Sequence, residues 1–203
     1  MYRKAVQHLR KVDPVLSGVI DSVGPCRFKT ASDLSHYESV ARAIIFQQLS
    51  GKAAATIHGR FDALFGEARP HAAALIGLSD ESLRSAGISR QKLGYLRDLS
   101  ERVHGGTLPI GSLHELGDDD VVRHLTTVKG VGQWTAQMFL MFRLGRLDIL
   151  PELDLGIRKG IQQSYRLRKL PTSERVLSIG AKWSPYRTIA SWYLWRSIDG
   201  DAS

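Results

Sequence analysis

Apolar residues recur at the spacing of an α-helix along most of the chain. No segment alternates apolar and polar residues convincingly, and no hairpin signal separates two strand-like runs. The clearest helical stripe follows Ser35 and consists of Tyr37, Val40, Ala41, Ile44 and Ile45. The pattern therefore predicts an all-α protein.

Helix start signals divide this pattern into roughly nine or ten helices, given a mean helix length of ~11–12 residues. Ser35 and Glu38 form a capping box, in which each side chain accepts a hydrogen bond from the other residue's backbone N–H. A helix is also expected from Gln133 to about Phe142. Further starts are predicted at Ser50-Gly51, Ser79, Ser89, Asp118, Asp154, Thr172 and Ser184-Pro185, with Pro185 at the first helical position.

A glycine-rich turn, Val128–Gly132, joins two apolar-periodic helices within residues 121–142. Its glycines permit positive φ angles and close approach of another backbone. A turn that opens a helix also directs N–H groups outward, where a phosphate binds readily. An ordinary helix–helix turn has the same glycines, but Lys129 within the turn and Trp134 just after it favour a phosphate site.

Charge narrows the choice of partners. The sequence has 28 Lys and Arg residues against 20 Asp and Glu residues, a formal net charge of +8 at pH 7. This excess favours an anionic partner, most simply a nucleic acid, although a merely basic globular protein fits the charge equally well. The positive residues are spread along the chain, so they do not form a disordered basic tail.

Cysteine usage and apolar runs exclude several classes of protein. Cys26 is the only cysteine, which excludes an intrachain disulfide, an iron–sulfur cluster and a thiolate-built zinc site. The start, MYRKAVQHLRKVDP, lacks the apolar run of a signal peptide, and no stretch approaches the ~20 apolar residues that span a bilayer. We expect a cytoplasmic protein, or a nuclear one in a eukaryote, without membrane association.

One carboxylate stands where it could carry chemistry. Asp154 follows Pro151 and precedes a predicted helix, whose dipole would support its ionised form. Most aspartates at such a place are helix caps. Glu152 and Asp148 are rivals nearby, and the residues alone do not separate the three.

Five separated motifs resemble, in the right order, those of the helix–hairpin–helix DNA glycosylase superfamily, and most of all its DNA-3-methyladenine glycosylase II (AlkA-like) branch. They are spread along most of the span from residue 36 to residue 203. The motifs are ARAIIFQQLSGKAAATIHGRF, AGISRQKLGYLRDLS, LTTVKGVGQWTAQMFLMF, LPELDLGIRKG and WSPYRTIASWYLWR.

The resemblance implies the two-lobed helical HhH-GPD fold, with an active-site cleft between the lobes. We expect residues 1–203 to form one such unit. One lobe would span about 36–146 and contain the hairpin 121–142, and the other would combine about 1–35 with 147–203. Long bacterial AlkA enzymes carry an additional N-terminal β domain, which this chain is expected to lack.

The resemblance also assigns roles to residues. It selects Asp154 as the catalytic residue, because its Asp-Leu-Gly setting matches the family's catalytic loop. It places Trp134 and Trp195 in a pocket for the target base, with Phe46 and Met138 as weaker candidates, although tryptophans at helical spacing are often core residues. We assign Trp183 and Trp192 to the core.

The gap that a flipped base leaves in the stack needs a filling residue. Gln48 takes the intercalating place by the resemblance, and Leu49 and Gln47 are its neighbours; a polar helix end is the plainer interpretation. DNA backbone contacts are assigned to Lys129, Gly130, Val131 and Gly132. Main-chain carbonyls of Thr126, Val128 and Val131 would hold a monovalent Na⁺ or K⁺.

The expected function is a monofunctional DNA glycosylase that flips alkylated bases, chiefly 3-methyladenine and 7-methylguanine, out of duplex DNA and leaves an abasic site. Superfamily members that also cut the strand use a lysine where this chain has Trp134. We expect a monomer with no cofactor for catalysis. The alternatives are a glycosylase for other damaged purines, a non-catalytic helix–hairpin–helix DNA-binding module, or a structural helical adaptor.

Overall fold

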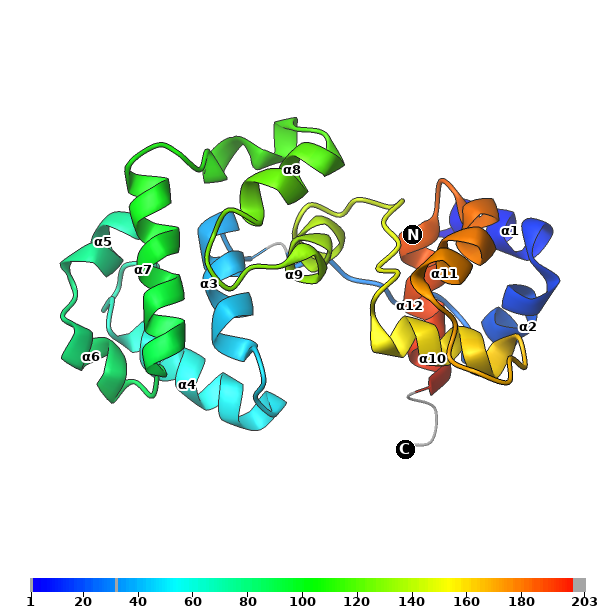
Figure 1. The fold of residues 1–203 in the computed structure, drawn as a ribbon, viewed down its shortest axis with the longest axis horizontal. Helices are drawn as coiled ribbons and strands as arrows, with labels where there is room; N and C mark the ends of the chain where they lie inside the picture. Colours follow the sequence, from blue (N-terminus) through cyan, green and yellow to red (C-terminus); the bar gives the residue numbers. More distant parts are fainter. Residues whose placement is uncertain (1, 32, 199–203) are drawn as a thin grey trace. The chain divides into compact units, whose positions relative to one another are not determined.

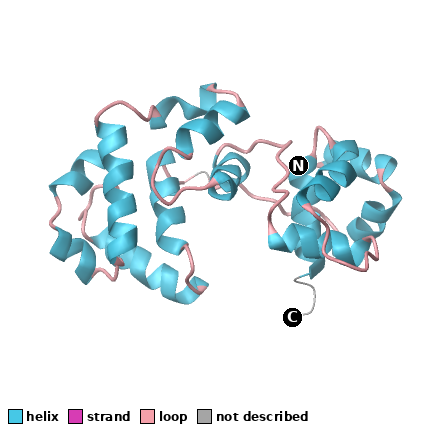
Figure 2. Ribbon diagram, in the orientation of Figure 1, coloured by secondary structure: helices cyan, strands magenta, loops and turns pink. Residues whose placement is uncertain are grey.

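The computed structural model describes residues 2–31 and 33–198. The chain divides into two compact units, of which the first combines Met1–Thr30 with Leu140–Ser203 and the second is Ala31–Phe139. Every regular element in the described residues is helical (Figure 2). The predicted all-α class is confirmed.

The first unit is built from both ends of the chain (Figure 1). Helix α12 packs against α10, α2 and α1, and the 3₁₀ turn η3 packs against α1 and α11. The elements are α1 (Arg3–Val12), α2 (Pro14–Val23), α10 (Leu155–Ser164), α11 (Ser173–Gly180), η3 (Ala181–Trp183) and α12 (Arg187–Ile198).

A buried aspartate ties these elements together. Asp13 is fully buried and caps α2 by accepting a hydrogen bond from Leu16 N at 3.2 Å. It also accepts hydrogen bonds from the Tyr165 hydroxyl and, at 2.8 Å, from Trp183 Nε1, and the Lys182 ammonium lies 3.1 Å away. Burial alone would raise the pKa of Asp13, but these donors lower it below its usual value. A charged Asp13 therefore joins α2 to the segment 165–183.

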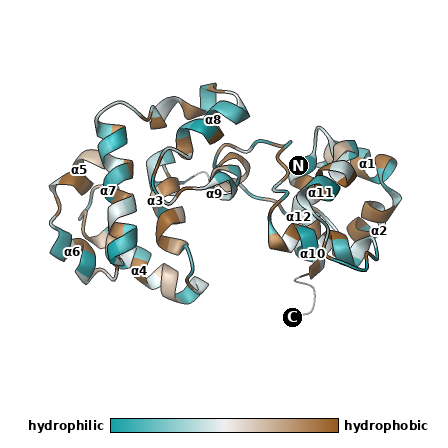
Figure 3. Cartoon of the chain, in the orientation of Figure 1, coloured by the Kyte–Doolittle hydropathy of each residue, from teal (hydrophilic) through white to brown (hydrophobic). Residues whose placement is uncertain are grey.

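The second unit is centred on the longest of its helices, α7, which packs against α3, α5 and α6. Hydrophilic residues dominate α7 (Figure 3), whereas its apolar side chains Leu96 and Leu99 are fully buried. The elements are α3 (His36–Phe46), α4 (Gly51–Ala63), α5 (Ala72–Gly77), α6 (Asp80–Ser85), α7 (Arg90–His104), the 3₁₀ helix η1 (Ile110–Glu115), α8 (Asp118–Leu125) and α9 (Gln133–Met138).

Most predicted helix starts are confirmed. The capping box of Ser35 and Glu38 is present at α3, and α4 begins at Gly51 as expected. Each of four further cap side chains accepts a hydrogen bond from a backbone N–H of the first turn: Ser79, Ser89, Asp154 and Thr172.

The predicted start of the last helix is wrong. Pro185 does not occupy its first position; the Ser184–Pro185 peptide bond is cis and α12 begins at Arg187. The start is held by Asp148, which accepts hydrogen bonds from the Ser184 hydroxyl at 2.8 Å and from Arg187 N at 3.2 Å. A distant carboxylate thus replaces the local cap that the sequence suggested.

Short helices account for the other differences. The described residues hold twelve α-helices rather than nine or ten, because elements such as α5 are only 6 residues long.

The helix expected from Gln133 to about Phe142 is α9 followed by a π-helical turn, η2 (Phe139–Arg143). The second unit ends at Phe139 instead of near residue 146, since Phe142 already packs against Phe28 and Trp195 of the first unit. Among the described residues, no helix has the length and apolar character needed to cross a membrane.

Candidate functional site

Asp154 lies at the N-terminus of α10, in the first unit. Its Oδ1 accepts hydrogen bonds from Ile157 N at 2.8 Å and from Trp195 Nε1 on α12 at 2.8 Å. Both partners are N–H donors, and the carboxylate lies at the positive end of the α10 dipole. The side chain is half-exposed, and it stands between two strongly exposed apolar residues, Leu153 and Leu155. Asp154 is thus both a helix cap and a solvent-accessible carboxyl group.

Gly156 permits the close approach of Trp195. A Cβ at position 156 would lie 2.8 Å from Trp195 Cδ1 and 3.0 Å from Asp154 Oδ1. The indole also stacks on Phe142, with ring centroids 6.0 Å apart and planes 26° from parallel. Sequence reasoning missed the roles of Gly156 and Phe142, although both lie within the quoted motifs.

The rival carboxylate Asp148 has a different role. Its oxygens accept hydrogen bonds from Arg187 Nε at 2.7 Å and from an Arg187 terminal nitrogen at 2.9 Å. Burial would raise the pKa of Asp148, but Arg187 and Ser184 lower it below its usual value. This bidentate ion pair gives Asp148 a structural role, because it fixes the start of α12.

The other tryptophans of α12 and η3 differ from Trp195. Trp183 is fully buried and donates to Asp13, which confirms its assignment to the core. Trp192 is half-buried and packs edge-on against Tyr193.

The hairpin turn between α8 and α9 lies on the Tyr95 ring. Gly130 has φ +78°, and a Cβ there would lie 2.2 Å from two atoms of the Tyr95 ring. Val128 and Val131 are buried, and Val131 N donates to Val128 O at 3.0 Å. The turn therefore requires glycine at position 130 for both its backbone angle and its contact.

Asp98 on α7 supports the same turn from below. Its Oδ2 accepts hydrogen bonds from Lys129 N at 2.9 Å and from Arg102 Nε at 2.8 Å. The exposed Lys129 ammonium lies 3.7 Å from Asp98 Oδ1. Burial would raise the pKa of Asp98, but the Arg102 and Lys129 donors lower it below its usual value.

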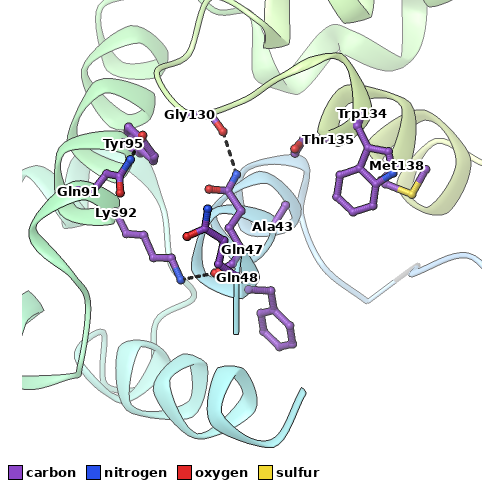
Figure 4. Close-up of a pocket in the computed structure, with 11 residues that line it drawn as sticks. Ala43, Gln47, Gln48, Gln91, Lys92, Tyr95, Gly130, Trp134, Thr135 and Met138 are labelled. Atoms are coloured by element: carbon purple, nitrogen blue, oxygen red, sulfur yellow. Dashed lines mark hydrogen bonds between the residues drawn. The ribbon is translucent and has the colours of Figure 1, made fainter. Parts of the chain in front are cut away.

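A pocket of about 520 Å³ opens in the second unit beside the hairpin (Figure 4). It brings together the predicted Phe46, Gln47, Gln48, Trp134 and Met138, whereas Leu49 is exposed outside the lining. Trp134 is 48% exposed, unlike a core tryptophan. The full lining is Ala43, Phe46, Gln47, Gln48, Gln91, Lys92, Tyr95, Gly130, Trp134, Thr135 and Met138.

The residues after α3 form a tight turn at the mouth of this pocket. Gln48 has φ +56°, a left-handed conformation that is uncommon outside glycine. Gln47 Nε2 donates to Gly130 O at 2.8 Å, which ties this turn to the hairpin. Sequence reasoning quoted the α7 motif that supplies Lys92 and Tyr95 but gave neither residue a role at the site.

The fold, the hairpin and the capped aspartate define a class. Residues 41–185 match the model of the HhH-GPD superfamily of base excision DNA repair proteins, and the chain belongs to this superfamily. The predicted family and HhH-GPD fold are confirmed.

Particular relatives share most of the chain. DNA-3-methyladenine glycosylase 1 of Schizosaccharomyces pombe is 34% identical over 197 residues, which are 96% of this chain and 86% of that protein. The solved structure of the S. pombe 3-methyladenine DNA glycosylase Mag1 in complex with abasic DNA matches with a TM-score of 0.84 over 95% of both chains. A DNA-3-methyladenine glycosidase from Bacillus halodurans matches with a TM-score of 0.87 and 37% identity, over 98% of this chain and 90% of that one.

Proposed function

We propose that this protein is a DNA-3-methyladenine glycosylase that removes alkylated bases from duplex DNA in base excision repair. The observation that carries the proposal is the Asp154 carboxylate, held by two N–H donors on Oδ1 at the end of α10, in a chain of the HhH-GPD superfamily. Because the substrate is duplex DNA, we place the reaction in the compartment that holds the genome, with a single chain as the acting unit.

Asp154 supplies the charge that the reaction needs. Breaking the bond between base and deoxyribose builds positive charge on the sugar, and a fixed anion stabilises that charge more in the transition state than in the ground state. The carboxylate also orients or deprotonates the attacking water. Trp195 and Ile157 fix the carboxylate so that it needs no reorganisation during the reaction.

The pocket beside the hairpin suits a flat, cationic base. Purines alkylated at N3 or N7 carry a positive charge, which an electron-rich indole face attracts. Trp134 offers an exposed indole, with Met138 and Phe46 completing the apolar lining. Stacking on such a ring returns ~1–3 kcal/mol per base toward the cost of flipping.

Water, not an amine of the protein, is the nucleophile. Position 134, where strand-cutting members of the superfamily carry a lysine, is occupied by a tryptophan in this chain. Without an amine there, no covalent link to the sugar forms and the product is an intact strand with an abasic site. No cofactor is required for this hydrolysis.

The hairpin binds the DNA backbone. We assign phosphate binding to the amides of Gly130 and Gly132 and to the Lys129 ammonium, while Val131 N is engaged within the turn. The carbonyls of Thr126, Val128 and Val131 are hard oxygen donors suited to Na⁺ or K⁺. Val128 O accepts a hydrogen bond from Val131 N, and a carbonyl oxygen carries two lone pairs. A bound cation would add positive charge next to a phosphate.

Replacing Asp154 with Asn tests the proposal. Asn keeps the Oδ1 acceptor for Ile157 and Trp195, so the fold and DNA affinity should persist, whereas release of free base should fall at least roughly 100-fold. Glu152→Gln is the matched control and should retain activity. Free bases released from methylated duplex DNA are measured by chromatography, and binding is measured on an abasic-analogue duplex. Undiminished base release by the Asn variant would overturn the assignment.

A further inference from the structure

Lys92, on the pocket side of α7, holds the end of α3. Its Nζ donates to Ile45 O at 2.7 Å and to Gln47 O at 2.7 Å. Figure 4 shows the side chain extending from α7 to the Gln47–Gln48 turn. Burial lowers the pKa of Lys92 below its usual value.

The end of α3 needs such a donor. The last carbonyls of a helix have no partner within the helix, and they carry the negative end of its dipole. Helices often end at a left-handed glycine, but here the left-handed residue is Gln48, with φ +56°. A side chain in that conformation is strained, because its Cβ comes too close to the following carbonyl oxygen. The charged bonds from Lys92 are well placed to stabilise this strained turn.

The same face of α7 also supports the hairpin. Tyr95, one turn further along α7, lies directly under Gly130. Gln47 Nε2 donates to Gly130 O at 2.8 Å. Lys92 therefore contacts the Gln47–Gln48 turn and Tyr95 contacts the hairpin turn. The two turns are also hydrogen-bonded to each other.

We propose that Lys92 is a positioning residue that holds the Gln47–Gln48 turn in the shape required to enter the DNA base stack when the target nucleotide is flipped. The proposal rests on the glycosylase function above and deepens it. Lys92 does not act on the sugar or the base; its two hydrogen bonds go to the main-chain carbonyls of Ile45, in the last turn of α3, and of Gln47, in the turn.

The test compares substrates that differ in how hard the base is to extrude. Lys92→Met keeps most of the stem but removes the donors. It should lower single-turnover release of 7-methylguanine about tenfold from a paired site, with a much smaller loss when the lesion is mispaired, because a mispaired base is easier to flip. The fluorescence of a 2-aminopurine next to the lesion should rise less on binding. An equal loss on both duplexes would overturn the proposal.

A double-mutant cycle with Gln48→Ala isolates the route of the effect. If Lys92 acts through the turn, Lys92→Met should cost little further activity once Gln48 is truncated. Additive losses would contradict the proposal. Lys92→Arg keeps the charge and the donors and should restore part of the activity. This variant keeps the test valid even if the Met variant folds poorly. Lys169→Met is the control for the lost charge, because Lys169 is exposed and belongs to the first unit, whereas the pocket lies in the second. If the wild type releases no base from either duplex, it is the glycosylase function that fails.

Discussion

At the scale of single residues, the site depends on glycines that let larger groups come close. Gly130 admits the Tyr95 ring beneath the hairpin, and Gly156 admits the Trp195 indole beside Asp154. In both cases an aromatic ring occupies the space that a Cβ would need. The glycines therefore permit the positions of the hairpin turn and of the indole that contacts the Asp154 carboxylate.

Gly130→Ala should damage both stability and DNA binding. The left-handed backbone costs a side chain about 1–2 kcal/mol, and the clash with Tyr95 adds an overpacking cost of about 1–3 kcal/mol. Denaturant unfolding and binding to an abasic-analogue duplex measure the two effects.

Gly132→Ala is the matched control for stability. Its φ is −94°, and a Cβ at position 132 would meet nothing within 4 Å. Equal destabilisation by the two alanine substitutions would show that the Tyr95 contact does not constrain the turn.

At the scale of elements, α7 organises the second unit. It supplies Lys92 to the end of α3, Tyr95 to the hairpin, and Asp98 to the backbone of Lys129. These residues follow one another at helical spacing, so a single helix face sets the positions of three site components. The sequence motif AGISRQKLGYLRDLS contains all three.

Asp98→Asn should remove the pH-dependent part of the stability that the Asp98 carboxylate gives to the hairpin turn. The pKa of Asp98 is lowered in the folded protein, so its ionised form stabilises the fold above the unfolded-state pKa of about 3.9. That stabilisation, roughly 1–2 kcal/mol for hydrogen bonds to a charged group, is lost as the pH falls through the folded-state pKa. Urea unfolding should show the wild type more stable at pH 7, with the difference shrinking toward pH 3. A difference that is the same at both pH values would contradict this account.

At the scale of the whole molecule, the net charge of +8 provides a general attraction for DNA, on which specific contacts are superimposed. Lys129 is exposed and stands in the hairpin turn, so we expect it to neutralise one phosphate. Most other cations are spread over both units and contribute to long-range steering.

Lys129→Met should reduce the salt dependence of DNA binding by about 0.9 in the slope of log K against log salt concentration. Fluorescence anisotropy between 50 and 200 mM salt, the range over which such contacts weaken markedly, measures the slope. Lys11→Met, on α1, removes the same charge outside the hairpin and should leave the slope nearly unchanged. Equal slopes for the wild type and the Lys129 variant would remove Lys129 from the phosphate contacts.

The sequence predicted the local features well and the distant contacts poorly. Helix caps such as Ser35 and Thr172 depend on neighbours within one turn, so they can be predicted from the local sequence. The start of α12 depends on Asp148, and the end of α3 depends on Lys92, which are partners that no local pattern reveals. The candidate Asp154 could be chosen by resemblance, but its contact with Trp195 spans 41 positions in the chain.

The composition of the first unit from both chain ends has a consequence for biosynthesis. During translation α1 and α2 emerge from the ribosome first, before Tyr165 and Trp183, the partners of Asp13, have been synthesised. The contiguous second unit can fold as soon as it emerges, but Leu9, Leu16 and Ile20, all buried in the finished protein, must wait for the carboxyl-terminal helices. During that interval the nascent chain presents an uncovered apolar surface of the kind that chaperones bind.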